Sequence, residues 1–292
     1  MTHDSRRGAR DCRRPPAPRQ RRQERLRAAA VVPILAGFAA ALGPVEPAAA
    51  QDRRGFRFGI GIPVERAGVT YEKAVDNTDP ETLAPAPRRG QVFEDEGSAS
   101  GPLAGLALLA GYRWPLGGGA FLSAEADFAL HRGALEAQLE GSGTSPSGRQ
   151  LGEVWPDEWS FEKQRSYGVT VRLGGSPGAL GSREESVYLL AGLHRVTAQM
   201  TVNWRGCLSP VPCTPDQFTS GADPRDLDFL TWTVGVGFEK GLGERLAVRA
   251  EGRYASYGEE SWVTDFPEVR VTVPTSVGGG GPGLSLMLVF GR

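Results

Sequence analysis

The feature of this sequence that most limits its fold is an alternation of apolar and polar residues at every second position. Successive side chains of a β-strand point to opposite faces, so this period predicts strands with one apolar and one polar face. No stretch sustains a helical period. The alternation recurs in eight runs, at residues 56–64, 106–114, 122–130, 167–173, 187–204, 230–238, 246–254 and 284–290. The sequence therefore predicts an all-β fold of eight strands.

The connections between these runs alternate in length. Those after the second, fourth and sixth runs are short, at residues 115–119, 174–185 and 240–244. The other four are long and polar, at residues 65–101, 132–162, 205–227 and 258–279. Short turns at one end and long loops at the other are typical of outer-membrane barrels. We therefore expect an eight-stranded antiparallel up-and-down transmembrane β-barrel with short periplasmic turns and long extracellular loops.

The charges on the polar face distinguish this barrel from a soluble one of the lipocalin type, which is apolar inside. An unpaired Arg or Lys facing lipid costs roughly 2–4 kcal/mol at the bilayer midplane. The interior of eight strands has room for side chains, and buried charges there require partners. We expect the apolar face of each run, including Val196 to Trp204, to point outward. The polar face should form an interior charge network of Arg57, Glu125, Asp127, Arg172, Arg249, Glu251 and Arg253.

Aromatic residues gather at the ends of the runs next to the short turns. An outer-membrane barrel carries such a girdle where the apolar band meets the headgroups. The alternative is the general preference of aromatic residues for strands. The girdle predicted from the sequence contains Phe56, Phe58, Tyr112, Trp114, Phe121, Tyr188, Phe238 and Phe290.

The first 50 residues have the pattern of a secretory signal. Residues 1–27 contain ten arginines, residues 28–43 are uncharged and mostly apolar, and an alanine-rich segment ends at Ala50. We expect a signal peptide over residues 1–50, cleaved between Ala50 and Gln51, and a barrel over residues 51–292. A membrane anchor is the alternative, although Pro33 interrupts a run that is shorter than a helical span requires.

Charge and cysteine content narrow the possible partners. The chain has 292 residues, with 33 Lys and Arg against 34 Asp and Glu, so no basic excess is available for binding nucleic acid. In an exported protein, Cys207 and Cys213 predict a local disulfide that stiffens a loop. A metal site is the alternative, but His131 and His194 lie far away in the sequence. We expect neither a metal site nor a cofactor.

Two segments resemble a known family. Thr233–Tyr254 is similar to the penultimate hairpin of the OmpA/OmpX-like outer-membrane β-barrel family, and Val187–Leu193 is similar to its fifth strand. The resemblance covers Gly55 to Phe290 and implies two partners: outer-membrane lipid, and the assembly machinery during insertion. The sequence departs from the family where Phe290 is followed by Gly291-Arg292 instead of ending the chain. We also expect it to lack the peptidoglycan-binding domain of longer relatives.

The sequence offers little for catalysis. A nucleophile needs a base in reach, and we expect His131 to be a solvated residue near the rim and His194 to be a packed or network residue. The acidic segments 94–96 and 223–228 lack the ligand spacing of a calcium loop. We therefore expect no catalytic residue. The predicted protein is a non-enzymatic barrel in the outer membrane of a Gram-negative-type bacterium, acting in envelope integrity or through an unknown loop partner. A lipid A-modifying enzyme, a small pore and a soluble periplasmic barrel are the alternatives.

Overall fold

The computed structural model describes residues 55–84, 88–139, 154–176, 185–206 and 214–291. The signal peptide, the cleavage site at Ala50 and Gln51, and Cys207 and Cys213 lie outside these ranges. Apart from one short 3-10 helix, η4 (Pro215–Gln217), the described elements are strands. They are β1 (Gly55–Asp76), β2 (Val92–Gly117), β3 (Ala120–Arg132), β4 (Ala134–Leu139), β5 (Val154–Gly175), β6 (Glu185–Gly206), β7 (Thr219–Gly241), β8 (Leu246–Phe266) and β9 (Val271–Gly291).

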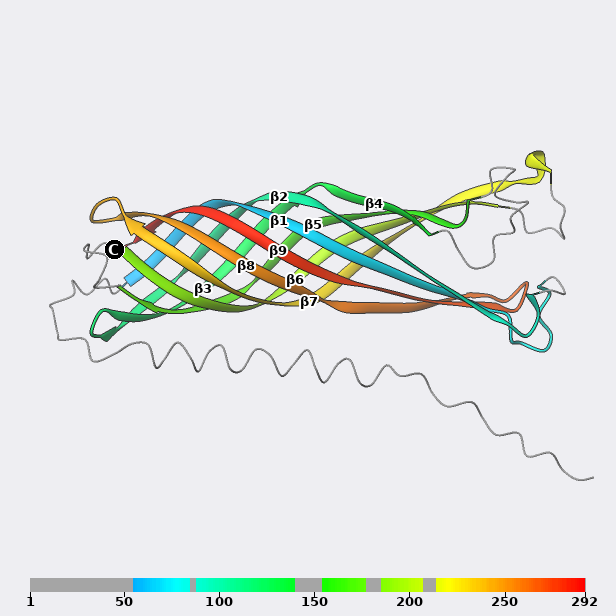
Figure 1. Cartoon of the computed structure of the whole chain (residues 1–292), viewed down its shortest axis with the longest axis horizontal. Coiled ribbons are helices and arrows are strands. Elements are labelled where there is room, and N and C mark those ends of the chain that lie inside the picture. The colour runs from blue at the N-terminus through cyan, green and yellow to red at the C-terminus, as the bar shows by residue number, and fades with distance from the viewer. Residues whose placement is uncertain (1–54, 85–87, 140–153, 177–184, 207–213, 292) are drawn as a thin grey trace, which may run out of the picture. The chain divides into compact units, whose positions relative to one another are not determined.

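These strands form one antiparallel sheet that closes on itself. Their order is β3-β2-β1-β9-β8-β7-β6-β5-β4, and β3 also pairs with β5. β3 and β4 are consecutive parts of one strand that is interrupted at Gly133, whose φ of 119° favours glycine. The ring therefore contains eight strands (Figure 1), which confirms the predicted fold. Among the described residues, no helix is long and apolar enough to span a bilayer.

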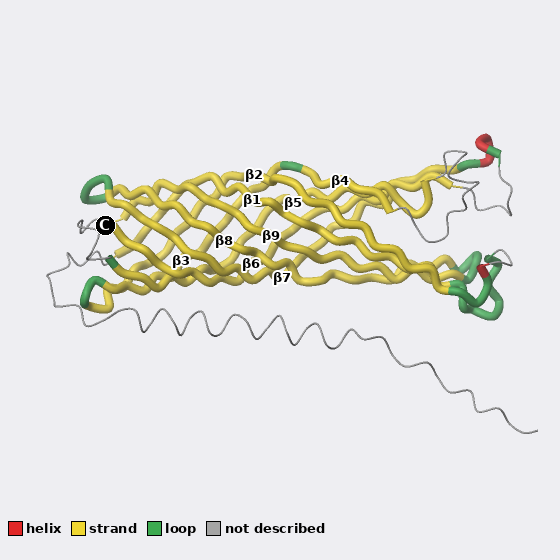
Figure 2. The backbone as a smooth tube through the Cα atoms, in the orientation of Figure 1, coloured by secondary structure: helices red, strands yellow, loops and turns green. Residues whose placement is uncertain are grey.

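The strands are longer than the predicted runs. β1 has 22 residues and β2 has 26, whereas about 9–11 residues suffice for a transmembrane strand. Much of the segments expected to be long loops is therefore strand. The connections at this end are 77–91, 140–153, 207–218 and 267–270. Figure 2 shows this continuous strand structure from the short turns toward the loop end.

Beyond the closed ring, the sheet separates into two four-stranded sheets. Pairing of β7 with β8 ends at Thr231↔Tyr257, and pairing of β2 with β3 ends at Ala104↔Arg132. Past these pairs, β4, β5, β6 and β7 form one sheet and β2, β1, β9 and β8 form the other. The two groups diverge toward the loop end in Figure 1. We call the closed part the barrel section and the remainder the projecting sandwich.

An apolar core fills the space where the projecting sandwich begins. Tyr71 contacts Trp159 with ring centroids 5.9 Å apart, and Phe229 contacts Tyr257 at the same distance. Trp159 and Phe161 are fully buried. The buried members of the core are Ala67, Val69, Tyr71, Leu103, Leu135, Leu139, Trp159, Phe161, Val196, Ala198, Met200, Leu227, Phe229, Tyr257 and Val277.

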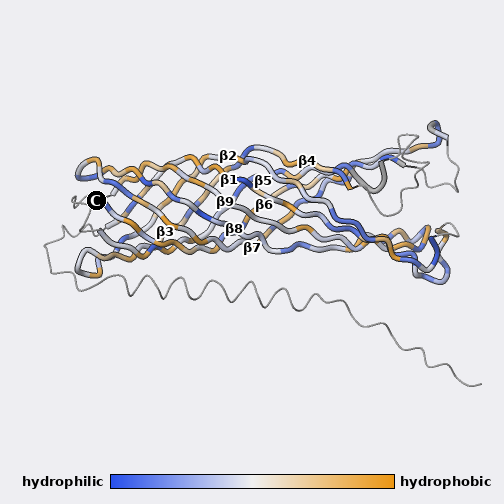
Figure 3. Tube along the Cα trace, viewed as in Figure 1, coloured by the Kyte–Doolittle hydropathy of each residue, from blue (hydrophilic) through white to orange (hydrophobic). Residues whose placement is uncertain are grey.

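The barrel section has the opposite polarity. Its outward side chains are apolar and exposed, as at Ile62 and Leu284, and apolar and polar residues alternate along the strands in Figure 3. Residues 56–64 rise about 3.3 Å each along a strand tilted near 40°, so this outward band is roughly 20–25 Å tall. That height matches the apolar band of a transmembrane barrel.

The change of polarity occurs within single strands and corrects one expectation. On the outer face of β6, Leu193 is followed by Arg195, and both are exposed. On the inner face, Val196, Ala198 and Met200 are buried, so the prediction that they point outward is wrong. Inward and outward positions alternate without interruption along β6, but the medium outside the strand changes from lipid to water. Apolar residues face out where lipid surrounds the barrel and face in where water does.

The aromatic girdle is also smaller than predicted. Phe121 and Tyr188 are 5% and 1% exposed and point into the barrel, where their ring centroids lie 6.1 Å apart. Phe121 lies two positions from the buried Ser123, and Tyr188 lies two positions from the buried Leu190, so both aromatic residues are on the inward face of their strands. The alternation of the strand thus decides where these side chains point, whatever the preference of aromatic residues for an interface. Phe56, Phe58, Trp114, Phe238 and Phe290 are exposed at this end, and the Tyr112 ring packs against Phe56 and Trp114.

Candidate functional site: the interior of the barrel section

The centre of the barrel section is an ionic network built around Arg249. This side chain is fully buried and donates Nη1 and Nη2 to the two carboxylate oxygens of Glu125, at 2.6 and 2.9 Å. Its Nε and Nη2 also donate to Oε2 of Glu239, at 3.1 and 3.0 Å. A guanidinium group suits this arrangement because its donors form a planar fork that matches a carboxylate.

Glu251 is the second centre of the network. Its Oε1 accepts hydrogen bonds from Arg172 Nε at 2.9 Å and from the Tyr188 hydroxyl at 2.7 Å. Its Oε2 accepts one from Arg253 Nε at 2.9 Å. Arg172 Nη1 also lies 2.8 Å from Glu125 Oε2, which joins this centre to the first.

Asp127 occupies the edge of the network nearest the loops. Its carboxylate accepts a hydrogen bond from the Thr170 hydroxyl and lies 3.4 Å from His194 Nε2. Arg172 Nη2 is 3.8 Å from its other oxygen. His194, which we expected to be a packed or network residue, is 6% exposed and faces this carboxylate.

The structure brings all seven charged residues named from the sequence into this interior and adds two more. Glu239 accepts hydrogen bonds from Arg57 at 2.6 Å and from Arg113 at 3.1 Å. The Arg113 guanidinium lies 3.8 Å from the centre of the Phe121 ring. Glu239 and Arg113 occupy inward-facing positions of their strands, so the alternation of the sequence is enough to identify them.

The described interior therefore contains five guanidinium groups and four carboxylates, one positive charge in excess. Each carboxylate contacts at least one arginine. Removing one partner would leave a charge buried without compensation, which costs about 3–5 kcal/mol. Close packing supports the network, because a Cβ at Gly237 would overlap the Tyr188 ring. We call these nine charged side chains the plug, because together they fill the cross-section of the barrel section.

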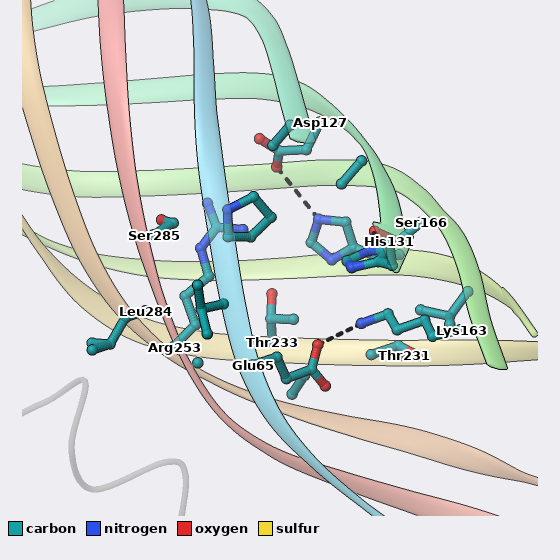
Figure 4. A pocket seen from close by; sticks show the side chains of 18 of the residues that line it. Glu65, Asp127, His131, Lys163, Ser166, Thr231, Thr233, Arg253, Leu284 and Ser285 are labelled. Atoms are coloured by element: carbon teal, nitrogen blue, oxygen red, sulfur yellow. Dashed lines mark hydrogen bonds and ion pairs between the residues drawn. The ribbon is translucent and has the colours of Figure 1, made fainter. Parts of the chain in front are cut away.

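A cavity of about 100 Å³ lies between this plug and the apolar core. Asp127 and Arg253 line it together with Glu65, His131 and Lys163 (Figure 4). Four buried atoms that line it have no hydrogen-bond partner within the described ranges: His194 Nδ1, Thr231 Oγ1, Thr233 Oγ1 and Ser285 Oγ. This volume and polarity suit a small cluster of water molecules.

A second group of polar side chains lies at the loop side of the cavity, beyond the membrane-spanning residues. Lys163 Nζ is 2.5 Å from Glu65 Oε2 and 3.2 Å from the Tyr257 hydroxyl, which donates to Glu65. Burial, reinforced by the Glu65 carboxylate, raises the pKa of Tyr257 above its ordinary value. The phenol therefore remains protonated and can act as the donor.

His131 is not the solvated rim residue expected from the sequence. It lines the cavity, and its Nε2 lies 2.9 Å from Ser166 Oγ. Burial, with a smaller effect from the Lys163 charge, lowers the pKa of His131 to about 3. No carboxylate in the described part of the chain contacts this imidazole. The pair therefore lacks the third group that orients the base in a catalytic triad.

The described residues contain no group of three or more His, Cys, Asp or Glu side chains that could hold a metal ion. The acidic segments 94–96 and 223–228 lie within strands β2 and β7. Their backbones pair with β1 and β6, respectively, instead of folding into loops.

Comparison with protein families identifies the architecture. A family profile described as "Outer membrane protein beta-barrel domain" matches residues 35–273, which is more than half of the chain. The chain belongs to this family. The closed ring and its outward apolar band are the features expected of an outer-membrane barrel. A search of curated proteins found no match.

Comparison with solved structures found matches of low sequence identity. Ail of Yersinia pestis, solved with the heparin analogue sucrose octasulfate, is 12% identical with a TM-score of 0.24, covering 77% of this chain and 98% of Ail. The outer membrane protease OmpT of Escherichia coli is 12% identical with a TM-score of 0.34, covering 79% and 96%. Neisserial surface protein A is 14% identical with a TM-score of 0.26, covering 77% and 95%.

Proposed function

We propose that this outer-membrane barrel protein is a non-enzymatic surface protein of a Gram-negative-type bacterium. Residues 1–50 direct its export and are cleaved between Ala50 and Gln51. The barrel section anchors the protein in outer-membrane lipid after insertion by the assembly machinery. The projecting sandwich then holds the connections 77–91, 140–153, 207–218 and 267–270 away from the membrane, where they serve envelope integrity or bind a partner.

The observation that carries this proposal is the filled interior. The plug formed around Arg249 and Glu251 lies below the cavity, and the apolar core around Phe161 lies above it. Eight strands enclose only enough space for side chains, so a continuous aqueous path would require both layers to rearrange. This supports a passive anchor over the alternative of a small pore.

The projecting sandwich gives the loops a rigid base. A protein that acts only by spanning the membrane has no need for strands of more than 20 residues, yet β1, β2 and β7 all exceed that length. Their buried aromatic side chains stabilise a structure beyond the apolar band. Cys207 and Cys213 belong to one of the connections at this end, and a disulfide there would stiffen it further.

The pair of His131 and Ser166 favours one alternative, a lipid-modifying enzyme. A neutral imidazole 2.9 Å from a hydroxyl has the distance of a base and its nucleophile. The pair faces the barrel interior and lacks an orienting carboxylate in the described residues. We therefore propose that the two side chains only line the cavity and take no part in catalysis.

Purified, processed protein in planar bilayers tests the proposal. A sealed anchor shows heat-modifiable migration on gels and no stepwise conductance. Stepwise conductance that changes in Glu251→Gln would instead establish a pore. Cells carrying His131→Ala should contain unaltered lipid A, and a specific change in lipid A structure would establish the enzymatic alternative.

A further inference from the structure

Four arginines lie on the outer surface directly above the apolar band. They are Arg66 on β1, Arg132 on β3, Arg165 on β5 and Arg195 on β6, and all four are exposed. Each follows or precedes by two positions the last outward apolar residue of its strand: Val64, Leu130, Tyr167 and Leu193. We call these four residues the arginine belt.

Strand pairing places the belt on one continuous side of the barrel. Arg132 pairs with Ala104, which pairs with Val64, two residues before Arg66. Arg165 pairs with Leu130 and Thr197, and Arg195 pairs with Tyr167. The pairing therefore shifts by two residues from each belt residue to the next, and this shift offsets the strand tilt of about 40°, so the four side chains lie at one depth. The belt therefore crosses the adjacent strands β1, β2, β3, β5 and β6. Neighbouring strands are about 4.8 Å apart, so the two ends of the belt are roughly 19 Å apart measured perpendicular to the strands.

The opposite side of the barrel has a different composition at this level. There, Asp228 follows the apolar residues of β7, while Ser256 and Pro282 occupy the corresponding positions of β8 and β9. Glu136 and Glu162 lie on the belt side, but farther from the apolar band. Positive charge is thus concentrated at one depth and on one side.

The belt guanidinium groups are available to a ligand. Arg66 and Arg132 make no ion pair within the ranges that the structure describes. Arg165 donates its Nε to Thr197 Oγ1 at 3.1 Å, which leaves its two terminal nitrogens able to donate to a ligand. Arg195 contacts Asp228 at 3.1 Å, but its side chain is 57% exposed.

The depth of the belt indicates its ligand. Side chains at the top of an apolar band reach the level of the lipid headgroups, and arginine can extend toward them while its stem stays against the apolar surface. Phosphate oxygens match the planar fork of a guanidinium. The exposed Tyr167 ring beside Arg195 adds an aromatic contact of the kind found at this interface.

We propose that the arginine belt binds the phosphate groups of phosphorylated lipid in the leaflet on the loop side. A one-sided belt would order such lipid around β1 to β6 and leave β7 to β9 in contact with bulk lipid. The site is separate from the barrel interior, so it does not depend on whether the protein is passive, a pore or an enzyme.

The test uses full-length processed protein in phosphatidylcholine nanodiscs that contain either bis-phosphorylated lipid A or its dephosphorylated form. Arg66→Gln with Arg132→Gln is the test variant. Lys240→Gln with Arg245→Gln removes the same charge from exposed residues at the short-turn end and is the matched control. Heat-modifiable migration verifies folding, and native mass spectrometry after mild detergent extraction counts retained lipid.

Wild type and the control should retain the phosphorylated lipid, and the test variant should bind it about tenfold or more weakly. Dephosphorylated lipid A should bind all three proteins equally weakly. The proposal is overturned if the folded test variant retains as much phosphorylated lipid as the control, or if removing the phosphates has no effect on wild type. Displacement of the lipid by an equimolar amount of inorganic phosphate would show a simple anion site and would also overturn it.

Discussion

Replacing Arg249 with methionine tests the interior network most severely. Arg249 is fully buried and makes four hydrogen bonds to Glu125 and Glu239. Methionine occupies similar space but leaves both carboxylates without this partner. Glu125 retains Arg172, and Glu239 retains Arg57 and Arg113, so the loss is partly compensated. We expect the free energy of unfolding to fall by about 3–5 kcal/mol, the cost of breaking a buried ion pair.

The assay is equilibrium urea unfolding in lipid vesicles, followed by tryptophan fluorescence and by the fraction of heat-modifiable protein. Lys240→Met is the matched control because Lys240 pairs with Glu185 at 3.0 Å on the surface, with its side chain 53% exposed. Exposed pairs contribute about 0–1 kcal/mol. Equal losses in the two variants would refute the reasoning, because the interior charges would then be as well solvated as surface ones.

Three further predictions test other parts of the structure. Phe161→Ala should destabilise the apolar core by about 3–5 kcal/mol and expose the projecting sandwich to protease, while the barrel section stays protected; cleavage confined to the short-turn end would contradict this. Leu288→Arg should cost about 2–4 kcal/mol in vesicles because Leu288 faces lipid beside Ile60, in the middle of the apolar band, whereas Leu288→Met should be nearly neutral; equal unfolding curves would contradict the assignment. His131 has a pKa lowered to about 3 from an ordinary 6.5, so below pH 6.5 the unfolded chain takes up a proton that the folded chain does not. Stability should therefore fall as the pH drops from 6.5 toward 3, by up to about 1.4 kcal/mol per pH unit from this group. The urea midpoint of His131→Gln should change less between pH 7 and pH 5 than that of wild type, and an identical change would contradict a buried neutral imidazole.

Much of the barrel section could be predicted from residue parity. The alternation around Val234 and Val248 identifies the strands, and the same parity places Arg249, Glu251 and Arg253 inside. The ion pairs themselves could not be predicted. Arg249 and Glu125 are 124 positions apart on strands that are not neighbours, and the period of a strand does not determine contacts across the barrel.

The sequence pattern does not predict the projecting sandwich, for a different physical reason. Val196, Ala198 and Met200 alternate with polar residues as regularly as the lipid-facing runs do, but they face inward. A period of two specifies that the faces differ without specifying which one is buried. The transition from Leu193 to Arg195 on one face is the signal that could have revealed it. Phe121 and Tyr188 occupy inward-facing positions, which the alternation along their strands predicts and their aromatic character does not.

The outer face of β6 provides the most direct test of the central claim, that this barrel passes from lipid into water partway along its strands. Nitroxide labels would be attached singly at positions 189, 191, 193, 195, 197 and 199 in a chain whose own cysteines are replaced by serine. Their accessibility to oxygen, which concentrates in lipid, and to a water-soluble nickel complex would then be measured in bilayers. The structure predicts that oxygen reaches the first three labels preferentially and that the nickel complex reaches the last three. Equal exposure of all six labels to the nickel complex would contradict the account.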